Sequence, residues 1–131
     1  MNDVKPNSIE AVIVFILYIC IQDGRISEEE SKELIITAPI IQKMYLHIFG
    51  EYIPFDLELI ISDMLAKLVK ETDLASGKNV KKAEKDLFSK LLTDHATQDI
   101  ALLASRSAAG ADGLHANENR KYQYWSEQWV D

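Results

Sequence analysis

Two short segments of this sequence share a spacing of acidic residues that can bind a cation. The first opens with Asp23-Gly24 and the second with Asp112-Gly113, at an offset of 89 residues. Each places a glutamate six positions after the aspartate. Hard divalent cations such as Ca²⁺ take several oxygen ligands, and an aspartate followed by a helix-borne glutamate supplies two. If the fold brings these acidic corners together, they predict a divalent-cation site with the candidate ligands Asp23, Glu29, Glu30, Asp112 and Glu118.

The same residues also fit a purely structural role at the start of a helix. Glycine readily takes the left-handed conformation that ends a helix, and aspartate bonds to loop amides. Acidic side chains in the next helix's first turn face the positive end of its dipole. Ser27 and Glu30 have the spacing of a reciprocal capping box, so Glu30 is a candidate both for capping the helix and for ligating the cation. Both interpretations of the corners stay open from the sequence.

A complete EF-hand is not predicted at either corner. Residues 23–30 match the second half of an EF-hand loop, but the first and third ligand positions fall on Ile19 and Ile21. Isoleucine has no atom that can ligate a metal. In the second corner the last ligand position falls on Asn119 instead of a glutamate.

The paired corners resemble those of the TerB-like family, small helical proteins and domains associated with tellurite resistance. The resemblance rests on a helix, then Asp-Gly, then a glutamate six residues after the aspartate, and it covers roughly residues 9 to 129. It implies a compact bundle of about seven helices with metal-binding positions at Asp23, Glu29, Asp112 and Glu118. It also implies a non-catalytic component of a metal-sensing or stress-response assembly that works near membrane partners.

No other group of residues has the spacing of an established catalytic site. Cys20 lies in an apolar run, which favours a buried hydrophobe over a nucleophile, and the three histidines have no metal-ligand spacing. The chain has no phosphate-binding glycine loop, dinucleotide fingerprint or nucleophile elbow. The sequence therefore predicts a protein that is not an enzyme. A hydrolase with a carboxylate-held metal is the enzymatic alternative, and it would require an open coordination position and a cleft.

The elements that must position the corners are all predicted to be helices. Asn7 and Glu10 have capping-box spacing at the start of the first helix, and Pro39 interrupts the helical pattern that begins at Ser27. No segment shows the sustained alternation of a strand. The predicted helices span about 7–23, 27–38, 39–49, 57–72, 80–94, 98–111 and 116–129.

Hydrophobic patterning predicts which faces of these helices are buried. Residues 11–21 are apolar on every side and too few to cross a membrane, which needs about 20 residues, so we expect a central buried helix. The helix after Asp56 and the last helix each carry one apolar face, the latter through Tyr122, Trp125 and Trp129. Tyr124 lies off that face and is a candidate for contact with a partner. The helix over 80–94 is predicted to bury Val80, Ala83, Leu87, Phe88, Leu91 and Leu92.

The opposite side of the helix over 80–94 is basic, with Lys78, Lys81, Lys82 and Lys85 at helical spacing. We expect a solvated face, or else a docking surface for an acidic partner or anionic lipid headgroups. Residues 23–33 have the opposite character, with five acidic and two basic side chains. Such separation of charge suits protein docking or cation binding.

Composition limits the remaining possibilities. A length of 131 residues fits one domain, and 14 basic against 21 acidic residues give a net charge of −7. That charge disfavours nucleic-acid binding, which uses an excess of lysine and arginine to neutralise phosphates. Without a recognisable signal peptide, we expect a cytoplasmic protein with a protein partner and membrane association only through partners. The overall prediction is a single all-α domain over 1–131, a bundle of six to seven helices built from two related halves.

Overall fold

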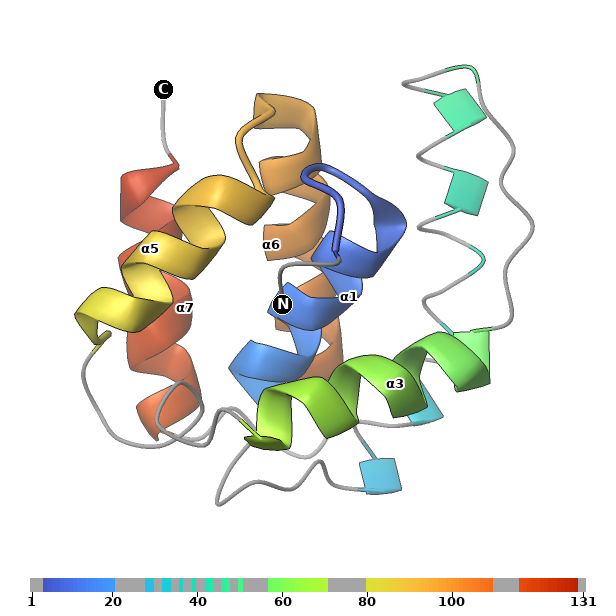
Figure 1. Ribbon diagram of the computed structural model, residues 1–131, viewed down its shortest axis with the longest axis horizontal. Coiled ribbons are helices and arrows are strands. Elements are labelled where there is room, and N and C mark those ends of the chain that lie inside the picture. Colours follow the sequence, from blue (N-terminus) through green and yellow to red (C-terminus); the bar gives the residue numbers. More distant parts are fainter. Residues whose placement is uncertain are drawn as a thin grey trace.

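The computed structural model describes residues 4–20, 28–29, 32–33, 36, 39, 42–43, 46–47, 50, 57–70, 80–109 and 116–129. Within these residues there is no strand, and the described residues between 28 and 47 are all helical. The predicted all-α class is therefore confirmed. Figure 1 labels α1 (Ile9–Cys20), α3 (Leu57–Lys70), α5 (Lys82–Leu91), α6 (His95–Ala109) and α7 (Ala116–Gln128).

Helix α1 lies at the centre of the molecule, as its uniformly apolar sequence predicts. It contacts α3, α6 and α7, which surround it in Figure 1. Every residue of α1 except Glu10 is buried, and Cys20 is only 1% exposed. A helix with no polar face can remain in water only when other helices cover it on most sides. The burial of Cys20 also agrees with its expected role as a small hydrophobe.

The surrounding helices turn their apolar faces toward α1. On α3 the buried side chains Ile61, Met64 and Leu68 follow the predicted helical spacing. On α7 both Trp125 and Trp129 are buried, while Tyr122 and Tyr124 are half-buried. Tyr124 is therefore less exposed than its position off the apolar face suggests.

The N-terminal segment, which leads into α1, is hydrogen-bonded to the turn between α5 and α6. Asn7 has a positive φ of 59°, and its side-chain oxygen accepts hydrogen bonds from the amides of Thr93 and Asp94, each at 2.9 Å. Its backbone amide donates to the Leu91 carbonyl at 2.7 Å. The predicted role of Asn7 as the cap of α1 is wrong, because Ser8 accepts the bond from the Ala11 amide instead. Asn7 thus connects segments 86 residues apart in the chain.

The boundary between α5 and α6 differs from the predicted one. Helix α5 ends at Leu91 and α6 already begins at His95, three residues before the predicted Gln98. Asp94, which was expected at the end of α5, accepts a hydrogen bond from the Ala96 amide at 3.0 Å and so caps α6. The buried face of α5 also differs, because Ala83 is exposed and Glu84 is buried. The expected burial of Phe88, Leu91 and Leu92 is confirmed.

Two further expectations concern the membrane and the predicted break at Pro39. Across the described part of the chain, no helix combines the length and apolar character needed to span a bilayer. Pro39 occupies a helical position, whereas residues 37 and 38, where the break was predicted, lie outside the described ranges.

Candidate functional site

The acidic corners fall largely outside the described residues. Asp23, Glu30 and Asp112 belong to the ranges that the structure does not describe. Glu29 occupies a helical position and its side chain is exposed, and Glu118 lies in the first turn of α7. Among the described residues, no group of three or more histidine, cysteine, aspartate or glutamate side chains is arranged to hold a metal. The cation site at the corners stays a prediction.

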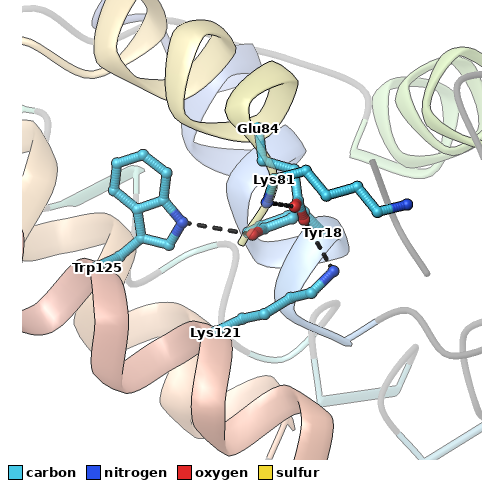
Figure 2. Close-up of polar contacts among 5 residues, drawn as sticks. All are labelled: Tyr18, Lys81, Glu84, Lys121 and Trp125. Atoms are coloured by element: carbon cyan, nitrogen blue, oxygen red, sulfur yellow. Dashed lines mark hydrogen bonds and ion pairs between the residues drawn. The ribbon is translucent and has the colours of Figure 1, made fainter. Parts of the chain in front are cut away.

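A buried ion pair lies at the junction of α1, α5 and α7 (Figure 2). The Nζ of Lys121 on α7 is 2.8 Å from Oε1 of Glu84 on α5. Their side chains are 3% and 0% exposed. Moving either charge out of water alone is costly, so each depends on the other for compensation. This pair therefore couples the position of α5 to that of α7.

Glu84 also caps the helix to which it belongs. It is the third residue of α5, and its Oε2 accepts a hydrogen bond from the backbone amide of the N-cap residue Lys81. An amide at this position has no partner within the helix, so the glutamate supplies one. A single carboxylate thus satisfies the start of α5 and neutralises a lysine from α7.

Tyr18 of α1 completes the polar cluster. Burial raises the pKa of its hydroxyl, and the neighbouring negative charge of Glu84 and a hydrogen bond with that carboxylate raise it further. Its hydroxyl oxygen accepts a hydrogen bond from the Trp125 indole at 3.4 Å, while the Lys121 ammonium lies 4.9 Å from the centre of its ring. Tyr18 therefore remains protonated at neutral pH and anchors the ion pair to the central helix.

Aromatic rings enclose this cluster. The ring of Phe88 lies 4.6 Å from Tyr18, 5.4 Å from Phe15 and 5.8 Å from Trp125, measured between centroids. Rings at these separations and tilts make favourable aromatic contacts and keep water away from the charges between them. Because both charged groups are closed off from solvent, the arrangement fixes helices relative to one another and does not present a reactive group to a substrate.

The sequence analysis missed both members of the ion pair, although a signal for each was present. Glu84 precedes Phe88 by four residues and Leu91 by seven, so it lies on the apolar face of α5. Lys121 similarly precedes Trp125 by four residues and Trp129 by eight. One acid and one base, each on the buried face of a different helix, indicate a buried pair once the two helices are placed together.

A separate surface hollow of about 420 Å³ lies beside the N-terminal segment, α1 and α3. Two lysines and one glutamate give it a mixed charge. The described residues that line it are Val4, Lys5, Glu10, Met64 and Lys67.

Comparison of the chain with protein-family models, with curated proteins and with solved structures finds no match.

Proposed function

We propose that this chain is a non-enzymatic helical module of the TerB-like kind that binds a divalent cation weakly or docks onto a protein partner. In this proposal the acidic corners supply the carboxylate oxygens, and the module acts within a cytoplasmic response to metal or tellurite stress. Its two corners would belong to two related halves that together form six to seven helices. The assignment to a family rests on the resemblance of the corners, together with the chain length and the helix content.

The observation that supports the proposal is that both corner glutamates, Glu29 and Glu118, occupy helical positions. Glu118 is the third residue of α7, immediately after the second corner, and Glu29 is helical and exposed immediately after the first. In the sequence, each of these glutamates follows the aspartate of an Asp-Gly pair by six residues. Aspartate and glutamate carboxylates are the oxygen ligands that a hard cation prefers.

A second candidate function is a helical interaction domain whose corner acids only cap helices. Glu84 favours this alternative, because it is the third residue of α5 and accepts the bond from the Lys81 amide. Glu118 has the same position in α7. The chain therefore already contains one glutamate that performs this capping role.

Thermal unfolding separates the two candidates. Bound cations are first removed from wild type and from Asp23→Asn/Asp112→Asn with a chelator. The melting temperature of each protein is then measured without cation and with Ca²⁺, Mg²⁺, Mn²⁺ or Zn²⁺. A cation at about 100 times its dissociation constant adds about 2.7 kcal/mol to the free energy of unfolding, or roughly 10 °C in a domain of this size. The cation proposal expects this shift in wild type and its loss in the double variant.

A matched control replaces two exposed aspartates elsewhere, as Asp63→Asn/Asp86→Asn, which changes the net charge equally. This control should retain the cation-induced shift. If no cation changes the melting temperature of wild type, the metal site is excluded and the corner acids are left as helix caps. If the control loses the shift as fully as the corner variant, the cation binds through overall charge and the corner site is wrong.

A further inference from the structure

The exposed side of α5 carries a charge opposite to that of the whole chain. Lys81, Lys82, Lys85 and Lys90 are exposed there with Asp86, which gives this surface a net charge of +3. Since the whole chain carries −7, the remainder carries −10. The second acid of α5, Glu84, does not offset the lysines at the surface, because it is buried and paired with Lys121. We call these four exposed lysines the lysine face.

The position of these lysines opposes the usual electrostatics of a helix. Lys81 is the N-cap of α5, Lys82 is its first residue and Lys85 its fourth, so three cations gather at the positive end of the helix dipole. Lys81 and Lys85 are also four residues apart, which is the spacing at which like charges repel. Local rules of stability are most often broken where a protein has a functional use for the residues.

An aromatic ring borders the lysine face. The ammonium of Lys85 lies 5.3 Å from the centre of the Tyr124 ring, and Tyr124 is half-buried on α7. Tyr124 packs at 5.2 Å against the buried Trp125, which holds its ring in place. A fixed tyrosine beside positive charges combines a rigid apolar contact with electrostatic attraction, as protein interfaces commonly do.

We propose that the lysine face, with Tyr124 at its edge, docks a short acidic segment of a partner protein. This inference specifies the docking half of the proposed function and rests on it. A helix of ten residues is about 15 Å long, which matches a few consecutive carboxylates of an extended chain. Complementary charge attracts such a segment and sets the orientation in which it binds.

Two other anionic partners fit this surface less well. A helix that binds lipid inserts an apolar face beside its basic residues, whereas on α5 Phe88 and Leu91 are buried and Leu87 is half-buried against the core. A nucleic acid extends beyond one helix and would meet the surplus negative charge on the rest of the chain. A short acidic peptide needs only the lysine face.

Fluorescence anisotropy with a fluorescein-labelled deca-glutamate peptide tests the proposal. Wild type should bind the peptide at about 20 mM salt and release most of it at about 200 mM, because screening shortens the range of the attraction. Lys81→Gln/Lys82→Gln/Lys85→Gln should weaken binding about tenfold or more. The matched control Lys5→Gln/Lys32→Gln/Lys43→Gln removes three other exposed lysines and should bind like wild type.

Stability provides an internal check on the lysine-face variant. Removing three cations from the positive end of α5 relieves their repulsion from the helix dipole, which offsets the lost contact between Lys85 and Tyr124. The melting temperature should therefore stay close to that of wild type, so lost binding cannot be attributed to unfolding. The Lys81 amide that donates to Glu84 belongs to the backbone and remains in the variant.

Three results would overturn the inference. They are no binding of deca-glutamate to wild type at low salt, equal loss of affinity in both triple variants, and tighter binding to phosphatidylserine vesicles than to the peptide. The thermal-unfolding measurements with cations are independent of the peptide-binding experiment. A cation-induced shift without peptide binding would retain the metal site and reject docking, and the opposite result would do the reverse.

Discussion

Glu84 takes part in contacts that reach three helices. It accepts a bond from the Lys81 amide at the start of α5, pairs with Lys121 of α7 and bonds with Tyr18 of α1. A buried charge of this kind adds little net stability compared with a well-packed apolar pair, but the loss of one partner leaves the other charge without compensation. Its effect is therefore to favour one arrangement of the three helices over others.

A double-mutant cycle on the ion pair tests this interpretation. Lys121→Met leaves a buried carboxylate unpaired and Glu84→Gln leaves a buried ammonium unpaired, so each should lower the free energy of unfolding by about 3–5 kcal/mol. The double variant buries neither charge, and its glutamine can still accept the bond from the Lys81 amide. It should lose less than the sum of the single changes by about 2 kcal/mol or more, measured by urea denaturation.

Arg120→Met is the control for this cycle, because Arg120 is exposed and adjacent to Lys121. It should change the free energy of unfolding by less than about 0.5 kcal/mol. Strict additivity of Lys121→Met and Glu84→Gln would show that the two groups do not interact.

Tyr18 makes the free energy of unfolding depend on pH in the alkaline range. Burial and the charge of Glu84 raise the pKa of its hydroxyl far above the ordinary value of about 10. The folded state then holds a proton that the unfolded chain releases, so the stabilisation is complete below about pH 10 and falls by about 1.4 kcal/mol for each unit above it. Urea denaturation of wild type and Tyr18→Phe across this range should show the difference.

In Tyr18→Phe the fall above about pH 10 should be smaller by that amount, because the variant lacks the hydroxyl that the folded state keeps protonated. The variant should also be less stable at neutral pH by about 1–3 kcal/mol, since the Trp125 indole loses its acceptor. Tyr122→Phe changes a half-buried tyrosine on α7 and should follow the wild-type pH profile. Identical dependence of stability on pH for wild type and Tyr18→Phe would contradict the raised pKa of the Tyr18 hydroxyl.

Among the helices, α7 is held on both flanks by contacts between a cation and an aromatic ring. Lys85 of α5 lies over Tyr124, and Arg106 of α6 lies 5.6 Å from the centre of the Tyr122 ring. The two tyrosines are two residues apart, which places them about 200° apart around the helix. These contacts at its edges and the buried tryptophans between them fix the rotation of α7 about its axis.

The attachment of the N-terminal segment to the α5–α6 turn provides a test at Asn7. Asn7→Gly keeps the positive φ but removes the side-chain bonds to Thr93 and Asp94, and should cost about 1–2 kcal/mol. Asn7→Ala should cost about 1 kcal/mol more, because alanine resists the left-handed conformation. Hydrogen exchange of the Thr93 and Asp94 amides should become faster in both variants.

Ser8→Ala is the comparison for Asn7, since it removes the cap of α1 and leaves the bonds to the turn intact. It should also cost about 1 kcal/mol without faster exchange at Thr93 or Asp94. If Ser8→Ala exposes those amides as much as Asn7→Gly does, the attachment depends on α1 and not on the Asn7 side chain.

For the molecule as a whole, the features that local sequence determines were predictable. The apolar run of α1 predicts a central helix, and Trp125 and Trp129 predict the buried face of α7, because helical periodicity alone selects these residues. The helical positions of Glu29 and Glu118 also follow from their corners. Whether the corner aspartates meet was not predictable, because it depends on how distant helices pack.

The features that the sequence analysis missed depend on contacts between distant segments. Aspartate is a favoured residue type for a helix cap, but the turn around Asp94 is fixed by Asn7, 87 residues earlier in the chain. Periodicity places Glu84 on the apolar face of α5, but its partner is identified only when α7 brings Lys121 within 2.8 Å. Propensity and periodicity describe single segments, so neither can reveal a partner on another helix.

The aromatic shell around Tyr18 has a spectroscopic consequence. The chain contains two tryptophans, and both are buried in this shell with ring centroids 4.9 Å apart. The tryptophan fluorescence of the protein, excited selectively over that of its tyrosines, therefore comes entirely from the junction of α7 with α1 and α5. Separation of α7 from that junction would shift the emission to longer wavelength, even while circular dichroism still recorded intact helices. Emission thus reports the packing of this junction, whereas dichroism reports helix content, without any added label.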